Sequence, residues 1–434
     1  MQLFAVIGKP ILHNQLPQLW NHAFRCLGIS AHCFRINPID IGRAVKALRG
    51  LQLSGCMVAP PFQHDLVKYL DESDNSVEQL QTVNTIKNDH GQLVGWNTDP
   101  SGIVDSLGDD NVAPDGKTVV ILGADGAAQA AAYGLLRAHA GHVILIDRNY
   151  ERAIRVAGRL GGRAVHFGGI KREVQQADIL ISCVSPSARR VIKPAWLHKG
   201  LTVFDLHHSS DSLLVQDARE GGCRVITGTY RLVYQAASAF RHFFRHSPVE
   251  AMKDAFNSQY GRKKPGDSIS FIGFMGAGKT TVGRQLAELT GKEFVDTDKL
   301  IEQKAGASIP DIFEQYGEAR FRAIERDVFE ELDFLPAKVI SCGGGAVIDE
   351  GIRSRLQSHS TVIWLWNELQ TSLARIERGT RPLFNVSNVG EKARALFKER
   401  IPTYAQCADM MMVNEQHTGI RHLAKKIYED ISYG

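Results

Sequence analysis

Residues 269–289 join an apolar run, a glycine-rich loop and an amphipathic pattern, and this order restricts the fold more than any other part of the chain. The run at 269–272 predicts a buried strand, the segment GFMGAGKT follows at 273–280, and apolar residues at helical spacing continue to Leu289. A strand, a GxxxxGK[ST] loop and a helix in this order are typical of phosphate-binding loops. The sequence therefore predicts an α/β nucleotide-binding domain in the second half of the chain.

The residue types of this loop match the chemistry of a bound nucleotide. Glycines let backbone N–H groups turn towards phosphate oxygens at the positive end of the helix. Lys279 would reach the β- and γ-phosphates, and the Thr280 hydroxyl would lie on Mg²⁺. The residues predicted to bind ATP here are Gly276, Ala277, Gly278, Lys279, Thr280 and Thr281. A glycine-rich turn without a ligand is the alternative, and the agreement of strand, loop and helix argues against it.

The composition is that of an ordinary soluble protein. The chain has 434 residues, 44% of them hydrophobic and 23% charged, with a net charge of +4. This mild charge argues against a nucleic-acid surface, and no apolar run approaches the ~18 residues of a membrane span. The seven cysteines form no CxxC pair, which argues against a disulfide framework or a zinc cage. We expect a cytoplasmic protein with small-molecule partners and no membrane partner; the oligomeric state stays open.

Strand-like runs alternate with helical patterns along most of the chain, which predicts an α/β fold with parallel sheets covered by helices. Strands are expected near 2–7, 31–36, 54–58, 118–122, 142–146, 178–183, 201–205, 268–273, 293–296, 338–341, 361–366 and 409–413. A polar, basic stretch at 257–267 reads as a linker, and the turn signal at 114–116 precedes a strand–helix–strand unit. We expect a substrate-binding domain at 1–105, a Rossmann-type dinucleotide domain at 106–257, a linker at 258–265 and a P-loop domain with a five-stranded parallel sheet at 266–434.

Charged residues and glycines beyond the loop indicate the phosphate acceptor. Asp296 and Asp298 follow a predicted strand, where one carboxylate can support a Mg²⁺-bound water and the other can take a proton from an attacking hydroxyl. Arg322 and Glu325 stand three residues apart on a predicted helix, so the glutamate can hold the guanidinium. Further candidates are the turn Gly343, Gly344 and Gly345, the basic segment with Arg378 and Arg381, and Arg400.

In their joint order these motifs resemble the shikimate kinases over essentially all of residues 266–434. The resemblance implies that ATP phosphorylates the 3-hydroxyl of shikimate with Mg²⁺, a step towards chorismate and the aromatic amino acids. It implies that Asp298 contacts the shikimate hydroxyls near the transferred proton and that Asp296 supports Mg²⁺ together with Thr280. Lys279, Asp298 and Arg381 are then the expected catalytic residues.

The resemblance also assigns the remaining candidates. Arg322 and Arg400 would hold the shikimate carboxylate, a task suited to the rigid guanidinium fork. Gly343, Gly344 and Gly345 would line the shikimate site. Arg381 would swing in on a lid to neutralise the γ-phosphate, and Arg378 would stack near the adenine.

The first half of the chain resembles the shikimate dehydrogenases. The marks are VIGKPILHN at 6–14, TVNTI at 82–86, GWNTDPSG at 95–102, the loop at 123–128, Asp147-Arg148 and the segment from Gly228 to Ala237. The resemblance implies a substrate cleft beside a dinucleotide domain. Asn84 and Asp99 would bracket the substrate hydroxyls, and Gln235 would add an amide contact.

Several positions depart from the dehydrogenase pattern. Gln63 follows Pro61-Phe62 where the family has a proton-transferring lysine, and an amide cannot supply or accept that proton. Leu16 stands where a substrate-binding serine is expected. Asp125 replaces a glycine of the cofactor loop and places a negative charge near the pyrophosphate. Asp147 favours the NAD ribose and Arg148 the NADP phosphate, so the pattern leaves NADP(H) binding in doubt.

Three interpretations therefore stay open for the first half. In the first, residues Gln63, Asn84, Asp99 and Gln235 form the remains of a dehydrogenase site that has lost its activity. In the second, the protein is bifunctional and also reduces 3-dehydroshikimate to shikimate with NADPH. In the third, the region is a non-catalytic domain that binds a ligand and regulates the kinase.

Overall fold

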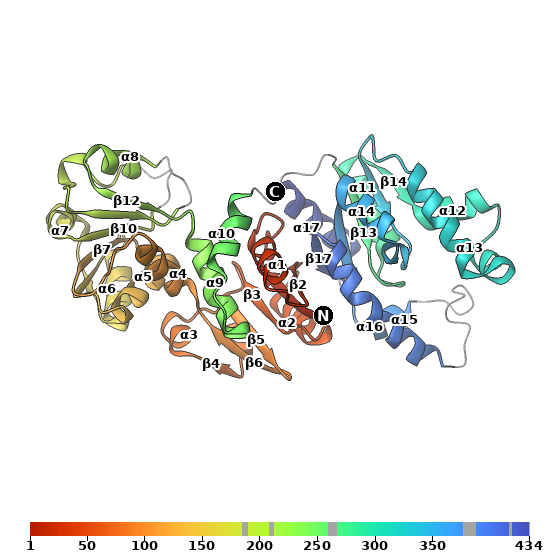
Figure 1. Cartoon of the computed structure of the whole chain (residues 1–434), viewed down its shortest axis with the longest axis horizontal. Helices are drawn as coiled ribbons and strands as arrows, with labels where there is room; N and C mark the ends of the chain where they lie inside the picture. Colours follow the sequence, from red (N-terminus) through yellow and green to blue (C-terminus); the bar gives the residue numbers. More distant parts are fainter. Residues whose placement is uncertain (185–189, 208–211, 259–266, 376–387, 416–418, 434) are drawn as a thin grey trace. The chain divides into compact units, whose positions relative to one another are not determined.

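The computed structural model describes residues 1–184, 190–207, 212–258, 267–375, 388–415 and 419–433 (Figure 1). Contacts divide the chain into two compact units, Met1–Phe62 with Gln259–Gly434 and Gln63–Ser258. Among the described helices, none is long and apolar enough to cross a membrane.

The first unit is built on one parallel sheet. Its described strands are β1 (Gln2–Ile7), β2 (Ala31–Asn37), β3 (Gly55–Val58), β13 (Ser268–Ile272), β14 (Glu293–Asp296), β15 (Lys338–Ser341), β16 (Ser360–Trp366) and β17 (Met410–Val413). They lie in the order β14-β15-β13-β16-β17-β2-β1-β3, and each neighbouring pair is parallel. Strands β1, β13 and β17 are buried almost throughout, as expected for a sheet covered on both faces.

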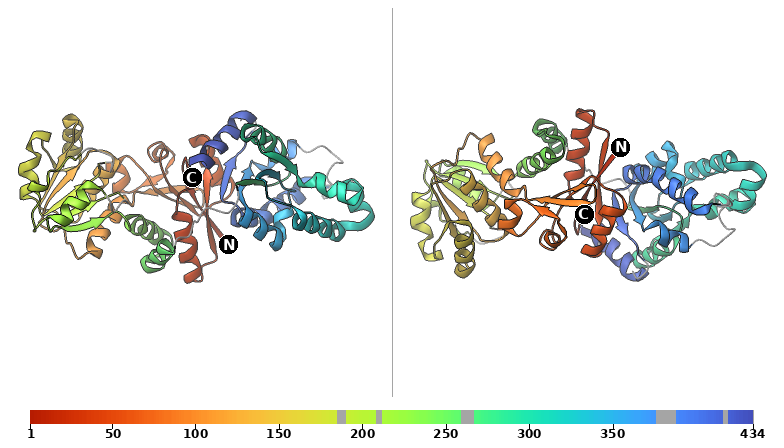
Figure 2. Two further views of the ribbon diagram at one scale, coloured as in Figure 1. Left: turned by 90° about the horizontal axis from the view of Figure 1, so that it is seen from above. Right: turned by 90° about the horizontal axis from the view of Figure 1, so that it is seen from below.

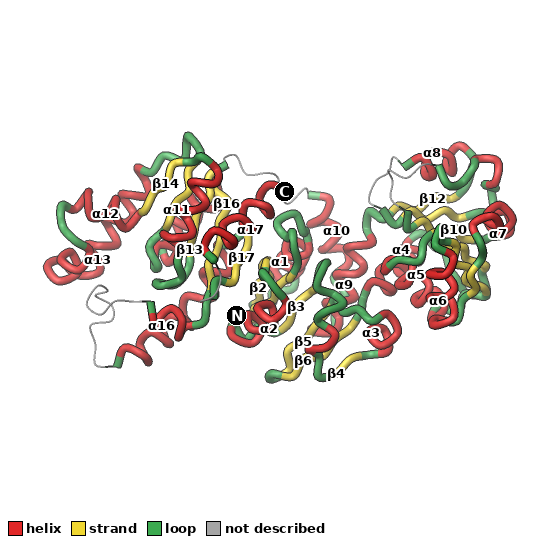
Figure 3. The backbone as a smooth tube through the Cα atoms, turned by 180° about the vertical axis from the view of Figure 1, so that it is seen from behind, coloured by secondary structure: helices red, strands yellow, loops and turns green. Residues whose placement is uncertain are grey.

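Helices connect these strands and cover the sheet (Figure 3). They are α1 (Leu16–Cys26), α2 (Ile41–Gly50), α11 (Lys279–Thr290), α12 (Thr297–Ala305), α13 (Ile309–Glu331), α14 (Glu350–His359), α15 (Leu369–Ala374), α16 (Val389–Cys407) and α17 (Ile420–Tyr433). The phosphate-loop helix α11 packs against α17, and α14 packs against α16 and β16. Helix α13 is broken at Gly317, where φ is +75°, so Arg322 and Glu325 lie on its second part.

The five strands predicted for the P-loop domain are present, but the sheet does not end at β17. Strand β2 pairs with β17 through Met411 with Ile36 and Met412 with Asn37. Figures 1 and 2 show this N-terminal segment beside the last strand and helix of the chain. The pairing covers the backbone groups that an edge strand would otherwise expose. Residues 1–62 therefore continue the sheet that carries the phosphate loop.

The second unit contains the predicted Rossmann-type sheet. Its parallel strands are β7 (Thr118–Leu122), β8 (His142–Ile146), β9 (Arg163–Ala164), β10 (Ile179–Ser182), β11 (Thr202–Asp205) and β12 (Arg224–Thr227), in the order β12-β11-β10-β7-β8-β9. The connecting helices are α5 (Gly126–Arg137), α6 (Tyr150–Leu160), α7 (Ile170–Gln176) and α8 (Leu213–Glu220). Apolar side chains cover both faces of this sheet and form two buried clusters.

The remainder of the second unit carries the residues predicted to contact a dehydrogenase substrate. Its elements are β4 (Glu72–Ser73), α3 (Asn75–Leu80), β5 (Thr85–Asp89), β6 (Gln92–Trp96), α4 (Asp99–Asp109), α9 (Arg231–Phe244) and α10 (Val249–Asn257). Strands β5 and β6 form an antiparallel pair, and α9 packs along α4. The close approach of α4 and α9 depends on Gly102, because a Cβ there would lie 3.0 Å from the carbonyl of Arg231.

The α/β class and the strands expected from the sequence are confirmed. The domain boundaries expected at 105 and 257 stay a prediction, and the contacts give a different division of the chain. The physical reason for the difference is the sheet itself, since β2 bonds to β17 and draws residues 1–62 into the unit that holds the phosphate loop. Most of the predicted linker, from residue 259 onward, lies outside the described residues.

Candidate functional site

The phosphate loop connects the end of β13 to the start of α11. Three of its glycines, Gly273, Gly276 and Gly278, have φ angles of +138°, +77° and +93°, which side chains rarely adopt. Space adds to this requirement, because a Cβ on Gly273 would lie 2.3 Å from the carbonyl oxygen of Leu365. The loop backbone therefore requires glycine at these positions, as phosphate-binding loops usually do.

Lys279, the first residue of α11, lies folded over the loop. Its Nζ donates hydrogen bonds of 3.0 and 3.1 Å to the carbonyls of Gly273 and Phe274, and the residue is 9% exposed. An ammonium group held by neutral carbonyls beside the loop can exchange them for phosphate oxygens. This position agrees with the role predicted for Lys279.

Thr280 and Asp296 come together beside the loop, as a magnesium site requires. The Thr280 hydroxyl donates to Oδ2 of Asp296 over 3.0 Å and lies 3.2 Å from the hydroxyl of Ser341. Mg²⁺ prefers oxygen ligands and usually combines one or two protein groups with substrate phosphates. No cluster of three His, Cys, Asp or Glu side chains that could hold a metal occurs among the described residues. The donors present fit an ion bound jointly with a nucleotide.

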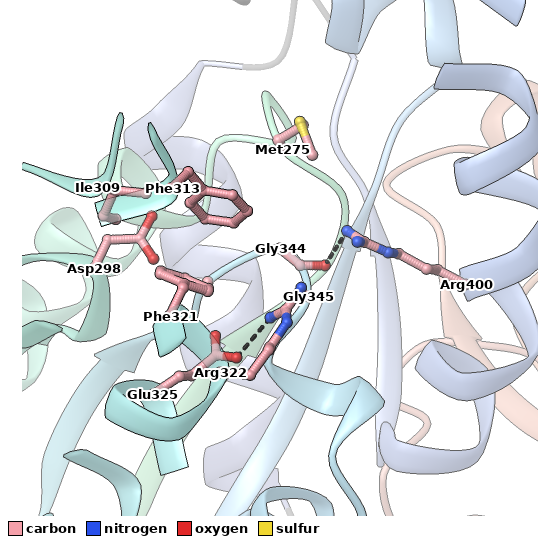
Figure 4. A pocket seen from close by; sticks show the side chains of 11 residues that line it. Met275, Asp298, Ile309, Phe313, Phe321, Arg322, Glu325, Gly344, Gly345 and Arg400 are labelled. Atoms are coloured by element: carbon pink, nitrogen blue, oxygen red, sulfur yellow. Dashed lines mark hydrogen bonds and ion pairs between the residues drawn. The ribbon is translucent and has the colours of Figure 1, made fainter. Parts of the chain in front are cut away.

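A cavity of about 60 Å³ lies next to the phosphate loop, and the residues predicted to bind the acceptor line it (Figure 4). We call it the acceptor cavity. Asp298 stands on one side of it and Arg400, from α16, on the other, with the glycine turn between them. Ile309, Phe313 and Phe321 form an apolar wall. The mixture of charged groups and a flat apolar wall suits a small ring that carries hydroxyls and a carboxylate.

Arg322 is fixed by two glutamates of its own helix. Its Nη1 donates to Glu325 over 2.6 Å and its Nη2 donates to Glu318 over 3.1 Å. The Glu325 side chain is 1% exposed, whereas that of Glu318 is 53% exposed. Burial disfavours the charge, but the two carboxylates outweigh it and raise the pKa of Arg322. Burial raises the pKa of Glu325, and the guanidinium opposes this shift.

The glycine turn after β15 lies against both charged groups. A Cβ on Gly345 would lie 2.6 Å from Nη2 of Arg322, and one on Gly343 would lie 2.8 Å from Oδ1 of Asp298. The carbonyl of Gly344 accepts hydrogen bonds from Nη1 of Arg400, at 3.0 Å, and from the Tyr404 hydroxyl. Side chains on this turn would therefore displace the groups predicted to hold the acceptor.

The two cavities share a wall. The cavity beside the phosphate loop has a volume of about 240 Å³, and Met275, Asp298 and Gly344 line both it and the acceptor cavity. A nucleotide and an acceptor placed in them would meet at Asp298.

Two predicted residues lie outside the part of the chain that the structure describes, and two residues that the sequence analysis does not name line the phosphate-side cavity. Arg378 and Arg381 lie outside the described residues. Arg375, three residues before Arg378, lines the phosphate-side cavity and donates to the carbonyl of Gly276 over 3.4 Å. Ser341 is the last residue of β15, as Asp296 is the last residue of β14. Its position at the end of a predicted strand is the sequence signal that could have indicated Ser341 as a site residue.

In the second unit, a cavity of about 250 Å³ lies where β7 and β8 end, the place of a dinucleotide in such folds. Asp125 lines it, and its carboxylate accepts a hydrogen bond of 3.1 Å from the backbone N–H of Ala128, capping α5. The carboxylate therefore occupies one of the N–H groups at this helix N-terminus, where anions can bind, and adds negative charge to the cavity.

Asp147 occupies the end of β8 on the same cavity. It is 7% exposed and accepts hydrogen bonds of 2.7 Å from the Asn149 backbone and from Nη2 of Arg152. The acid is thus held in the place where such folds bind a ribose hydroxyl, while Arg148 lies exposed on the cavity rim.

The four residues of the predicted dehydrogenase remnant all belong to the second unit. Asn84, 1% exposed, accepts hydrogen bonds from the Thr98 backbone and from the hydroxyls of Thr85 and Thr98. Burial raises the pKa of Asp99, while Arg231, 3.8 Å away, and Asn84 lower it. Gln235 packs on Gly102, and the Gln63 carbonyl accepts from the Val83 backbone. Asn84 and Asp99 are therefore neighbours, as the resemblance implies.

Comparisons with known proteins match three segments of the chain. Residues 275–432 match the family described as shikimate kinase, residues 6–86 match the shikimate dehydrogenase substrate binding domain, and residues 108–206 match shikimate / quinate 5-dehydrogenase. The NADP(+) shikimate dehydrogenase of Moorella thermoacetica is 34% identical over 281 residues, which are 61% of this chain and 95% of that protein. The one from Pyrococcus abyssi is 31% identical and covers 60% of this chain and 100% of its own length.

Solved structures agree with these matches. Shikimate dehydrogenase from Aquifex aeolicus superimposes with a TM-score of 0.54 at 26% identity, over 59% of this chain and 97% of that one. Shikimate 5-dehydrogenase from Thermus thermophilus, solved with NADP(H) and shikimate, gives a TM-score of 0.54 at 25% identity, over 59% and 99%. The chain therefore belongs to the shikimate dehydrogenase family through its N-terminal part and carries a shikimate kinase domain fused at its C-terminal part.

Proposed function

We propose that residues 266–434 transfer the γ-phosphoryl group of ATP to the 3-hydroxyl of shikimate. The shared wall of the two cavities is the observation that best supports this proposal. Because Asp298 and Gly344 line both, an acceptor hydroxyl beside Asp298 would face the phosphate end of a nucleotide on the loop.

The reaction needs one proton transfer and strong charge neutralisation. The acceptor oxygen bonds to the γ-phosphorus as the bond from that phosphorus to the β–γ bridging oxygen breaks, and ADP leaves. The Asp298 carboxylate accepts the hydroxyl proton. Lys279 exchanges the carbonyls of Gly273 and Phe274 for phosphate oxygens and neutralises their charge. Thr280 and Asp296 would hold Mg²⁺, which would supply further charge neutralisation.

Two arginines hold the shikimate carboxylate in this proposal. Arg322 uses one side of its guanidinium for the buried Glu325, which keeps it in place. The exposed Glu318 accepts a hydrogen bond from the other side of the guanidinium, and the shikimate carboxylate replaces Glu318 there. Arg400 approaches from α16 and completes the clamp.

An assay of ADP release tests the proposal, with the product identified as shikimate 3-phosphate. Lys279→Ala should lower turnover by about 10²-fold or more, because direct stabilisation of the transferring group is lost. Lys292→Ala is the matched control, since that lysine bonds to the Asp267 carbonyl away from the loop. Near-normal turnover of Lys279→Ala would contradict the assignment of the phosphate loop.

We also propose that the dehydrogenase-like region does not reduce 3-dehydroshikimate at an appreciable rate. Gln63 cannot transfer the proton that carbonyl reduction requires, and loss of such a group typically costs ~10²–10⁴-fold. Asp125 caps α5 where a pyrophosphate would bind. Both features support a domain that has kept its fold and lost its chemistry.

A bifunctional enzyme is the second candidate, and membership of the dehydrogenase family favours it. Asn84, Asp99 and Gln235 are retained, and the dehydrogenase product would be the kinase substrate. Oxidation of NADPH by the full chain with 3-dehydroshikimate distinguishes the candidates. Binding of shikimate to this region without turnover would instead support a regulatory domain.

A further inference from the structure

We propose that residues 1–62 position the phosphate loop of the kinase, with Asn414, Glu415, Arg43 and Lys46 as positioning residues. The proposal rests on the kinase function proposed above and concerns how its nucleotide site is held. It follows from a continuous series of contacts between α2, the end of β17 and the loop.

An asparagine that directly follows β17 forms a hydrogen bond with the backbone of the phosphate loop. The side-chain amide of Asn414 donates to the carbonyl of Ala277 over 2.7 Å, in a buried position. A Cβ on Gly278 would lie 2.7 Å from the same nitrogen, so the contact is close as well as polar. The Asn414 backbone N–H in turn donates to the carbonyl of Trp366 over 2.7 Å. Its position therefore depends on β16 and β17.

A second asparagine, at the end of β16, has the same relation to the loop. Nδ2 of Asn367 lies 3.5 Å from the carbonyl of Gly276, and its Oδ1 accepts from the Ser372 hydroxyl over 2.6 Å. The ends of two adjacent strands thus hold two consecutive carbonyls of the phosphate loop.

Both strand ends contact α2 of the N-terminal segment. Glu415, the residue after Asn414, lies 3.1 Å from Nζ of Lys46 and 3.8 Å from Nε of Arg43. The side chains of Arg43 and Glu415 are only 14% and 21% exposed. Trp366, the residue before Asn367, packs against Gly50, where a Cβ would lie 3.0 Å from its ring. Two independent contacts therefore join α2 to the support of the loop.

Strand pairing makes this support rigid. The last residue of β2, Asn37, pairs with Met412, two residues before Asn414. Backbone N–H groups of a phosphate loop must converge on the phosphates, so a small displacement of Ala277 or Gly278 weakens several hydrogen bonds at once. Loss of the α2 contacts should therefore weaken nucleotide binding more than acceptor binding.

The full chain is titrated with a fluorescent N-methylanthraniloyl-ATP in the presence of Mg²⁺, and KM for ATP and for shikimate is measured in parallel. We expect Asn414→Ala to raise the nucleotide Kd about tenfold and Glu415→Gln about threefold, in the range of coupling through neighbouring contacts. KM for shikimate should stay within about twofold of the wild-type value.

Two further variants separate positioning from loss of stability. Exchanging the charges of the closer pair, with Lys46→Glu and Glu415→Lys together, should restore part of the nucleotide affinity that Glu415→Lys alone loses. Lys338→Ala removes an ion pair of 2.7 Å with Glu293 at the other ends of the same sheet's strands and should leave the nucleotide Kd unchanged. An unchanged Kd in Asn414→Ala and Glu415→Gln, or an equal rise in both KM values, would overturn the proposal. Failure of the wild type to phosphorylate shikimate would count against the proposed function alone, since the titration needs no acceptor.

Discussion

The carboxylate of Asp430, on α17, accepts a hydrogen bond of 2.5 Å from the side-chain amide of Asn37, which stands 393 positions earlier at the end of β2. The same carboxylate accepts from the backbone N–H groups of Ile11, at 2.9 Å, and Leu12, at 3.4 Å. Asp430 is 2% exposed and Asn37 is 1% exposed. One buried acid thus joins the last helix of the chain to its first loop.

Asp430→Ala should lower the free energy of unfolding of the full chain. The substitution leaves buried donors on Ile11 and Asn37 without an acceptor, and we expect a loss of about 3 kcal/mol. Urea unfolding measures it. The matched control is Glu429→Ala on the same helix: its side chain is 40% exposed, and its 2.6 Å pair with Lys426 should contribute less than about 1 kcal/mol. Equal effects of the two substitutions would contradict the buried link.

A fragment of residues 266–434 should self-associate more than the full chain and bind ATP more weakly. Without β2, strand β17 becomes an edge whose backbone groups are open to pairing with another molecule. We expect the fragment to self-associate and to bind ATP more weakly. Light scattering during size-exclusion chromatography, at matched concentrations, detects the association. A monomeric fragment with full-chain ATP affinity would show that residues 1–62 are dispensable.

The sequence could predict most elements but not their assembly. The segments at 409–413 and 31–36 are both predicted as strands, because their apolar residues are a local signal. Their pairing joins positions more than 370 residues apart, and a local pattern contains no information about such a partner. The predicted domain division rests on the linker, which is also a local signal, and makes no use of this pairing.

The same limit applies within the sites. Asp296, Asp298, Arg322 and the glycine turn are predicted from their motifs, because the chemistry of phosphoryl transfer restricts both residue type and spacing. Asn414 carries no such motif, and only the folded chain places it on Ala277. Asp125 was interpreted as a charge in the cofactor loop, and the structure adds that it caps α5.

Lowering the pH should reduce the free energy of unfolding of the first unit, because His32 on β2 is protonated more easily in the unfolded chain. Burial lowers the pKa of His32 to about 4, a hydrogen bond from the ring to the Ala405 backbone opposes this shift, and Arg25 adds to it. Since the unfolded pKa is about 6.5, the unfolded state binds more protons between these values, and stability falls as the pH drops through this range. We expect His32 to contribute a loss of about 2 kcal/mol between pH 7 and pH 5.

Urea unfolding at pH 7 and pH 5 tests this expectation by comparing the wild type with His32→Gln. The glutamine variant cannot be protonated in this range, so its stability should fall less between the two pH values. Replacing an exposed histidine, His90→Gln, should leave the wild-type pH dependence in place. The same pH dependence in wild type and His32→Gln would exclude His32 as the source.

Arg322→Lys should weaken shikimate binding far more than ATP binding. A lysine cannot hold Glu325 and a substrate carboxylate at the same time with the geometry of a guanidinium fork. We expect the shikimate constant to rise by about 10²-fold and the nucleotide constant to change by less than about twofold. Parallel titrations with the two ligands decide. Arg326→Lys, at an exposed pair of 3.5 Å with Asp349, serves as the control.

Restoring two residues should bring back dehydrogenase chemistry in the N-terminal region. Gln63→Lys supplies a proton-transferring group, and Asp125→Gly frees the Ala128 N–H for a pyrophosphate and removes a negative charge. The two changes act on different steps, chemistry and cofactor binding, so their effects on the rate should multiply. NADPH oxidation with 3-dehydroshikimate measures the rate, and a fluorescence titration with NADPH measures binding separately. We expect Asp125→Gly alone to tighten NADPH binding without turnover, and the double variant to exceed either single one. Robust turnover by the unmodified chain would instead establish a two-step enzyme that makes and then phosphorylates shikimate.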